Sequence, residues 1–382
     1  MSTQLLQHRG AHRVAVTSAV SHLPDGAAAV AEIAVALGPH ADLYAVFVAP
    51  GYDLAAVGAA LRTQFGDRVI GCSSSGNISL NGYDRTGISA MALAGGGLHA
   101  RTITVGPLDD PADAVERAGA ELAGLRAEVA DGDGFAILLT DGLTRSEDLL
   151  AANLMAALGD VPIIGGSAGD ELVFRRTAVY HGGTFQTNLA TVTVVRTESA
   201  FRLVRLQHHE PTDVILIATD VDPDLRIVRS FNGRPAAQVY AEAVGTDLAA
   251  IGPTTFSRHP LLLNAGGSSW VRSIATAHED RSLSMFARVD IGDVLRLGRP
   301  SGMLEKLESR LAAVGAELGS IGGMLTFDCI LRRLEFEAAG LDDHVGAVLA
   351  AHRAVGFSTY GEQFNGMHMN QTLVAVVFAG PA

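Results

Sequence analysis

The sequence predicts a mixed α/β protein in which a strand–helix–strand unit occurs three times and a β-rich insert interrupts the series. Three observations lead to this fold class. The chain has 382 residues, 48 % of them hydrophobic and 18 % charged, so it can bury a large core. Apolar strand-like runs alternate with helix-like runs over about thirty residues, the size of a βαβ crossover. Each of these units ends in a turn with the pattern Gly-x-Ser.

The three units share one order of elements: a strand, a helix, a second strand with the turn, and a later apolar strand. The helix of the first unit is an Ala- and Leu-rich stretch after its first strand. Taking the units in turn, we expect first strands at 43–48, 135–140 and 325–330, helices at 146–158 and 342–353 in the second and third, turns at Ser73, Ser167 and Ser358, and later strands at 88–94, 190–195 and 373–378.

The helix of the second unit has clear signals at both ends. Ser146 precedes Glu147 and Asp148, which places acidic side chains in the first turn, where the helix dipole favours them. Gly159 follows the last apolar residue and suits a helix C-terminus, because glycine adopts positive φ at little cost. The sequence therefore predicts a helix that begins and ends at these residues.

A region of different character lies between the second and third units. It contains short apolar runs separated by turn signals, which predict strands at 201–206, 214–219, 226–231, 260–263, 271–277, 284–289 and 293–297, with a short helix at 235–244. We place a boundary near 197–201, which gives domains at 1–199, with two units, and at 200–382, with the β-rich part at 200–298 and the third unit at 320–382.

Charge and composition exclude several kinds of partner. Lys and Arg total 28 and Asp and Glu total 41, so the net charge of 28 − 41 = −13 repels phosphates and anionic lipids. We therefore expect no nucleic acid and no membrane partner. Cys72 and Cys329 are isolated and read as buried apolar residues. No signal peptide or apolar run of ~18 residues is present, which indicates a cytoplasmic protein. A homo-oligomer is expected because symmetric dimers are common.

The turn at residues 165–169 matches the Gly-x-Ser-x-Gly motif of serine hydrolases. A nucleophile elbow needs a helix directly after the serine, whereas residues 172–180 read as a strand. The turns at Ser73 and Ser358 occupy the same place in their units without the full motif, so a repeated structural turn explains all three. We therefore expect no catalytic residue and no enzyme, although Ser73 and Ser167 are candidates for lining a ligand pocket.

Two adjacent histidines lie between strands of the β-rich part. Adjacent residues on a strand face opposite sides, so His208 and His209 should not clamp one metal ion together. A single inward-facing imidazole at a strand end is a candidate axial ligand of haem iron. The alternative is a solvated or hydrogen-bonded histidine in a turn before Pro211.

The segment after the third turn is rich in side chains that both donate and accept hydrogen bonds. Such a loop is costly to bury unless its groups are paired, so it should either bind a ligand or join the units together. The pocket candidates in this segment are Gly361, Glu362, Asn365, His368, Asn370 and Gln371.

The chain resembles the FIST family of sensory domains over nearly its whole length, with a FIST N part and a FIST C part. The resembling stretches are Gly71-Cys72-Ser73 with Gly76, residues 161–170, and residues 357–362 with Asn370-Gln371-Thr372. The resemblance implies a signal-transduction sensor that acts on a separate partner protein.

Further stretches are similar to the haem-binding, nitric-oxide-sensing NosP-like branch of that family: Gln207-His208 with Pro211-Thr212, residues 226–228 with Asn232-Gly233 and 235–237, and residues 271–274. This similarity implies haem b as cofactor, nitric oxide as gas ligand, and a histidine kinase or cyclic-di-GMP enzyme as partner. His208 matches the family histidine and would bind the iron; His209 departs from the pattern and is the alternative ligand. Arg272 is a candidate partner for a haem propionate. The competing hypothesis is a haem-free module that binds a small polar metabolite such as an amino acid.

Overall fold

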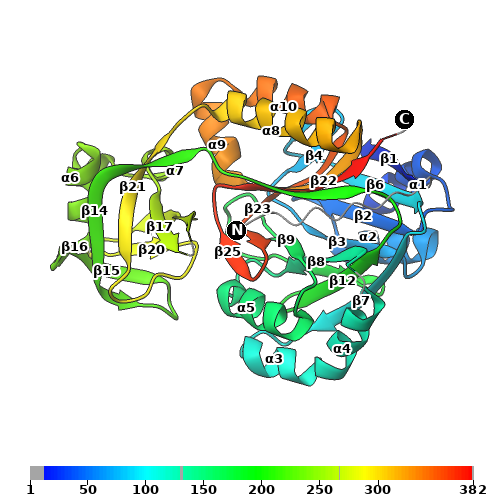
Figure 1. The fold of residues 1–382 in the computed structure, drawn as a ribbon, viewed down its shortest axis with the longest axis horizontal. Helices are drawn as coiled ribbons and strands as arrows, with labels where there is room; N and C mark the ends of the chain where they lie inside the picture. Colours follow the sequence, from blue (N-terminus) through cyan, green and yellow to red (C-terminus); the bar gives the residue numbers. More distant parts are fainter. Residues whose placement is uncertain (1–12, 130–131, 266, 381–382) are drawn as a thin grey trace.

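The protein is described by a computed structural model that covers residues 13–129, 132–265 and 267–380. Three six-stranded sheets and their helices form a body, and an eight-stranded sheet forms a second lobe beside it (Figure 1). We call this second lobe, residues 209–300, the insert. The mixed α/β class and the β-rich insert are therefore confirmed.

The three sheets of the body have the same strand order. Each contains a parallel pair from one unit, flanked on one side by the later antiparallel strand of that unit and then by an edge strand. Sheet 1 is β1 (Val14–Ser21), β6 (Ile88–Gly95), β2 (Leu43–Val48), β3 (Val69–Ser73), β10 (Val179–His181) and β11 (Thr184–Gln186). Sheet 2 is β7 (His99–Val105), β12 (Ala190–Arg196), β8 (Gly134–Thr140), β9 (Ile163–Ser167), β24 (Glu362–Phe364) and β25 (Met367–Met369). Sheet 3 is β13 (Phe201–Leu206), β26 (Leu373–Ala379), β22 (Ile321–Cys329), β23 (Ala354–Thr359), β4 (Asn77–Ser79) and β5 (Gly82–Asp84).

The last two strands of each sheet come from a different unit. The hairpin β4–β5 of the first unit pairs with β23 of the third, β10–β11 of the second pairs with β3 of the first, and β24–β25 of the third pairs with β9 of the second. Each unit thus gives a hairpin to one neighbour and receives one from the other. The body has an approximate threefold arrangement as a result.

The glycine of each Gly-x-Ser turn has a common structural cause. Gly71, Gly165 and Gly356 lie opposite the neighbouring parallel strand, where a Cβ atom would approach a carbonyl oxygen to 2.2, 1.9 and 1.7 Å respectively. Such distances are shorter than any real contact, so only glycine fits. The repeated turn is therefore a packing requirement of the sheets.

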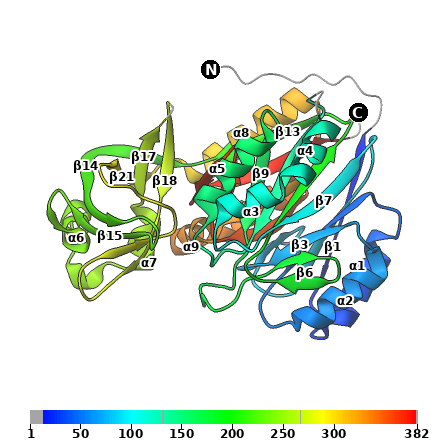
Figure 2. The ribbon, with the colours of Figure 1, turned by 90° about the horizontal axis from the view of Figure 1, so that it is seen from below.

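The helices cover the outer faces of the sheets. Figure 2 shows α1 and α2 on one side of the strands β1, β3 and β6. In α5, Gly159 has a φ of 63° and its N–H donates to Met155, as the sequence predicts. The α-helices are α1 (Gly26–Leu37), α2 (Leu54–Phe65), α3 (Pro111–Arg117), α4 (Gly119–Glu128), α5 (Glu147–Leu158), α6 (Ala236–Val244), α7 (Pro253–Arg258), α8 (Met303–Leu318), α9 (Ile330–Ala339) and α10 (Asp342–Ala351), with a short 3₁₀ helix η1 (Leu248–Ala250).

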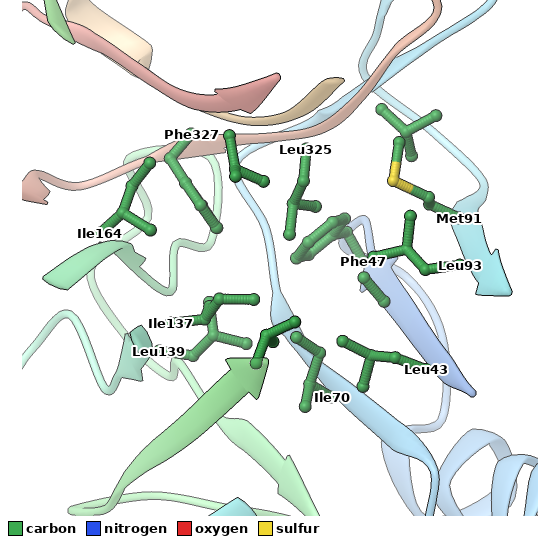
Figure 3. Close-up of a cluster of buried hydrophobic side chains, with 14 of the residues drawn as sticks. Leu43, Phe47, Ile70, Met91, Leu93, Ile137, Leu139, Ile164, Leu325 and Phe327 are labelled. Carbon is green, nitrogen blue, oxygen red and sulfur yellow. The ribbon is translucent and has the colours of Figure 1, made fainter. Parts of the chain in front are cut away.

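The inner faces of the three sheets share one hydrophobic core, seen in Figure 3. Leu43 and Phe47 of sheet 1 meet Ile137 of sheet 2 and Leu325 of sheet 3 there. Alternate residues of β2, such as Tyr44, face outward into a second cluster with α1 and α2. Strands buried on both faces read as continuous apolar runs, which is the pattern seen in the sequence.

The insert has its own sheet and its own core of buried residues from β14, β15, α6, α7 and β21. Its strands are β14 (His209–Asp222), β15 (Ile227–Phe231), β16 (Arg234–Pro235), β17 (Leu261–Ala265), β18 (Ser268–Arg272), β19 (Ile274–Ala277), β20 (Leu283–Met285) and β21 (Val294–Pro300).

Several details differ from the sequence prediction. The strand expected at 172–180 is formed only at β10 (Val179–His181), because the residues before it are turns and loop. The strand at 201–206, assigned to the β-rich part, is β13 and pairs with β26 of sheet 3, because it continues the repeated strand order of the body. Helices α1, α3, α4, α7, α8 and α9 were not predicted. The division of the chain at 199 and 200 separates residues that strand pairing joins, since the third unit shares its sheets with the first two. Among the described residues no helix is both long and apolar enough to cross a membrane.

Candidate functional site

The insert contacts the body through ion pairs at the start of α5. Arg226, which precedes β15, places its Nη2 atom 2.6 Å from Oε2 of Glu147 and 2.8 Å from Oδ2 of Asp148. Its Nη1 atom donates to the carbonyl of Phe286, 2.6 Å away. Arg226 and Glu147 are both buried, so this ion pair is shielded from solvent and fixes the insert against the second unit.

A second contact region contains His208, His209 and Glu335. The two histidines lie where the chain passes from β13 into β14, and Glu335 lies on α9 of the third unit. Nε2 of His208 is 2.9 Å from Oε2 of Glu335, and Nε2 of His209 is 3.4 Å from Oε1 of the same carboxylate. All three side chains are buried, and one nitrogen or oxygen of each lies within 4.8 Å of the others.

The expectation that adjacent histidines face opposite sides is wrong here. The rings of His208 and His209 lie 4.2 Å apart between centroids, and both face Glu335. Strand alternation does not apply because β13 ends at Leu206 and β14 begins at His209, which leaves His208 in the irregular connection between them.

An arginine sets the tautomer of His208. Nη1 of Arg332 is 2.8 Å from Nδ1 of His208, and arginine can only donate, so Nδ1 accepts and Nε2 carries the proton donated to Glu335. Arg332 is held by Asp328, whose Oδ1 atom is 2.7 Å from Nε, and Asp328 also accepts from the hydroxyl of Tyr83. The cluster thus reaches from the insert to the hairpin of the first unit.

Burial determines the charges in this cluster. It lowers the pKa of His208 to about 3, so the imidazole is neutral at pH 7. Burial alone would raise the pKa of Glu335, but the contacts with His208 and His209 outweigh it and lower the pKa to about 2. Glu335 is therefore ionised.

The residues present do not fit a haem iron at His208 in this conformation. Both ring nitrogens are hydrogen bonded, and the side chain is 0 % exposed between His209, Phe336 and α9. The described cavities of about 700, 380 and 280 Å³ have neither His208 nor His209 in their walls. Arg272, the proposed propionate partner, is buried and donates to the carbonyl of His368, 3.2 Å away. Haem ligation by His208 or His209 stays a prediction that these contacts disfavour.

Ser73 and Ser167, the two turn serines predicted to line a ligand pocket, differ in exposure. Ser73 borders the cavity of about 280 Å³, although its hydroxyl already donates to Gly169 and accepts from Ala178. Ser167 is 0 % exposed and accepts from Nε2 of Gln363, 2.9 Å away. No helix follows it within the described residues up to β10, so the elbow geometry of a hydrolase is not formed.

The polar segment after the third turn joins units. Glu362 and the backbone of Gly361 pair with sheet 2, and Glu362 also binds Thr372 and Thr359. Asn365 accepts from the N–H of Ile163, 3.1 Å away. Gln363 approaches His368, Asn370 donates to the carbonyl of Tyr360, and Gln371 contacts Ser273 and Ser257 of the insert. Asn365 is exposed, whereas Gly361, Glu362, His368, Asn370 and Gln371 are buried among protein groups; none of these six residues borders the described cavities.

Two neighbouring cavities lie between the second unit and the insert, on either side of the loop between β8 and α5. Leu143 and Arg145 of this loop border both. The larger, about 700 Å³, is mainly polar, with walls that include Asp141, Ser146, Asp148, Asn188, Asp224 and Arg288. The smaller, about 380 Å³, is bordered by Phe174, Phe286, Tyr360, Leu225, Met285 and His278.

Arg145 is the charged residue of this site that lacks a partner. Arg226 and Arg288, which border one cavity each, are paired with carboxylates, whereas within the described part of the chain Arg145 forms no ion pair or hydrogen bond. Its φ of 57° is unusual for a residue other than glycine, and such strain is frequent at binding sites. Arg145, Arg332 and Glu335 were not predicted from the sequence; only the position of Arg145 after a parallel strand could have indicated a site.

Comparison with known protein families agrees with this architecture. Residues 42–234 match the family model of the FIST N domain, and residues 236–365 match that of the FIST C domain. No curated protein matches the chain. The two matches together include the insert and parts of all three units, and the first alone covers half of the chain, so the chain belongs to the FIST family, whose members are sensory domains of signal transduction.

Proposed function

We propose that this protein senses a small polar metabolite that carries a carboxylate, such as an amino acid, and binds it between the second unit and the insert. The observation that carries the proposal is Arg145, an unpaired cation that borders both cavities at this junction. The junction follows the carboxyl end of the parallel strand β8, the edge of an α/β sheet at which ligands usually bind.

The walls of the two cavities suit such a ligand. Arg145 can receive a carboxylate in a bidentate contact. Asp224 and Asp148, which already contact Arg288 and Arg226, bring acidic oxygens near the same loop. Phe174, Phe286 and Tyr360 give the smaller cavity an aromatic surface for an apolar side chain.

The position of the site explains how binding becomes a signal. Arg226 and Arg288 of the insert approach the acids at the start of α5, so a ligand held by Arg145 would change the contacts that orient the insert. A ligand shifts a conformational equilibrium only if it binds the two states differently. A site built from both lobes meets this condition, and a separate signalling protein would read the change.

A thermal-shift screen of amino acids and related carboxylates on the full chain tests the proposal. A cognate ligand at about 100 times its Kd should stabilise the protein by about 2.7 kcal/mol, which raises Tm by several degrees. Arg145→Ala should remove this shift. Arg353→Ala is the matched control, because Arg353 is also exposed with a φ of 52° but borders none of the described cavities.

Two outcomes would contradict the proposal. One is a ligand shift that Arg145→Ala leaves unchanged. The other is a sharp Soret band after addition of hemin that moves with nitric oxide and weakens in His208→Ala, which would establish the haem-based sensor instead.

A further inference from the structure

The group of His208, His209 and Glu335 has an uncompensated charge and unpaired atoms. Glu335 is 2 % exposed, and within the described residues no arginine or lysine pairs with it, because Arg332 pairs with Asp328. Buried charges in proteins are generally paired or bound to metal ions. The carboxylate of Glu335 therefore lacks a counter-ion.

His209 has side-chain atoms without hydrogen-bond partners among the described residues. The side chain is buried, yet neither Nδ1 nor Nε2 has a hydrogen-bond partner in the described part of the chain, and the same holds for Oε1 of Glu335. A buried imidazole with two unpaired nitrogens is rare enough to require an explanation by a missing ion or water. Nε2 of His209 and Oε1 of Glu335 are only 3.4 Å apart.

We infer that His208, His209 and Glu335 bind a divalent transition-metal ion such as Zn²⁺, a site independent of the metabolite proposed above. Two imidazoles and one carboxylate are a common zinc ligand set, and the three candidate ligand atoms lie within 4.8 Å of one another. The ion would supply the counter-charge of Glu335 and occupy the free atoms of His209.

Two existing contacts of His208 must change when the ion binds: the hydrogen bond from Nε2 to Glu335 and the hydrogen bond from Arg332 to Nδ1. Nε2 of His208 would give its lone pair to the metal, so the proton would move to Nδ1 and Arg332 would withdraw its hydrogen bond there. No proton is gained or lost by the ring. A single ion requires only these changes, whereas a haem would also require a slot between β14 and α9.

The location suggests what the ion does. The histidines lie on the connection that enters the insert, and Glu335 lies on α9 of the body. A bound ion would link these two segments and fix the base of the insert to α9.

Titration of the metal-free full chain with Co²⁺ and Zn²⁺ tests this inference. We expect one equivalent of Co²⁺ to give the visible d–d bands of a low-coordinate N/O site and Zn²⁺ to displace it and raise Tm. In His209→Ala and Glu335→Gln the affinity should fall by more than roughly 100-fold, because even outer-shell partners of metal ligands contribute about 10- to 100-fold.

The choice of variants keeps the result interpretable. The side chain of His209 makes no hydrogen bond in the described structure, so His209→Ala should remain folded without metal, which circular dichroism checks. His344→Ala removes an exposed histidine of α10 and controls for surface binding. Absence of stoichiometric binding, or equal affinity in wild type and His209→Ala, would overturn the inference and leave the metabolite hypothesis untouched.

Discussion

Glu362 is a carboxylate buried at the junction of two units. Its oxygens accept from Thr359 and from Thr372, whose hydroxyl is 2.6 Å away, and it has no cation partner within the described residues. Burial raises its pKa to about 8. A carboxyl group that titrates so high in the folded protein makes folding stability depend on pH, because the unfolded chain releases the proton near pH 4.5.

We expect Glu362→Gln to stabilise the protein above neutral pH. Between about pH 4.5 and 8 the folded state retains the proton and the unfolded state does not, so stability falls as pH rises through this range. The amide keeps the hydrogen bonds and removes the effect, a gain on the order of 4 kcal/mol at pH 8. Urea unfolding at several pH values measures it, and Glu308→Gln, an exposed change on α8, is the control. The hypothesis fails if the stability–pH slopes of wild type and Glu362→Gln coincide.

At the scale of elements, the parallel strand pairs are the most constrained parts of the body. In each pair the glycine of the turn faces a backbone carbonyl, which cannot move without breaking the sheet. The serine that follows is therefore placed by strand geometry, and its hydroxyl is available for hydrogen bonds between units, as with Ser167 and Gln363.

Gly165→Ala should destabilise the protein by roughly 3 kcal/mol or more, because its Cβ would lie 1.9 Å from the carbonyl oxygen of Leu138. Gly315→Ala is the opposite case. Gly315 lies within α8, and its new Cβ would lie an ordinary 3.9 Å from the side chain of Ile321 in β22. Alanine should therefore stabilise α8 by roughly 0.5 to 1 kcal/mol. Chemical denaturation of both variants compares them; equal effects would show that the close approach to Leu138 is not limiting.

At the scale of the whole molecule, the three units of the body share one core and the insert has a core of its own. The central cluster takes residues from all three sheets, and sheet 2 depends on the hairpin β24–β25 from the end of the chain. The insert begins and ends at neighbouring positions, since His209 pairs with Pro300.

Removing residues 320–382 should therefore unfold the remaining units, even though two of the three are complete in sequence. The excised insert, residues 209–300, should fold alone around its own core. Circular dichroism and the dispersion of amide NMR signals measure both. A folded, monomeric chain ending at residue 319 would contradict the dependence of sheet 2 on the last hairpin.

Local patterns in the sequence predicted much of this fold and little of the site. The doubly buried strands and α5 were found because their apolar runs and end signals lie within a few residues of one another. Helix α9 was missed because it buries Arg332, Arg333 and Glu335, charged residues that normally mark an exposed face. The pairing of hairpins between units and the cavity at Arg145 depend on contacts between distant segments, which periodicity does not record.

Because each unit donates a hairpin to one neighbour and receives one from the other, the three units of this single chain form a closed ring. Each unit presents one surface to the unit on one side and a different surface to the other, the head-to-tail relation that closes a trimer with C3 symmetry. One unit made alone would keep an open sheet edge and an unplaced hairpin, so copies of it would recruit one another until three had assembled. The covalent chain replaces that assembly step, and the insert lies in the chain between β13 and α8.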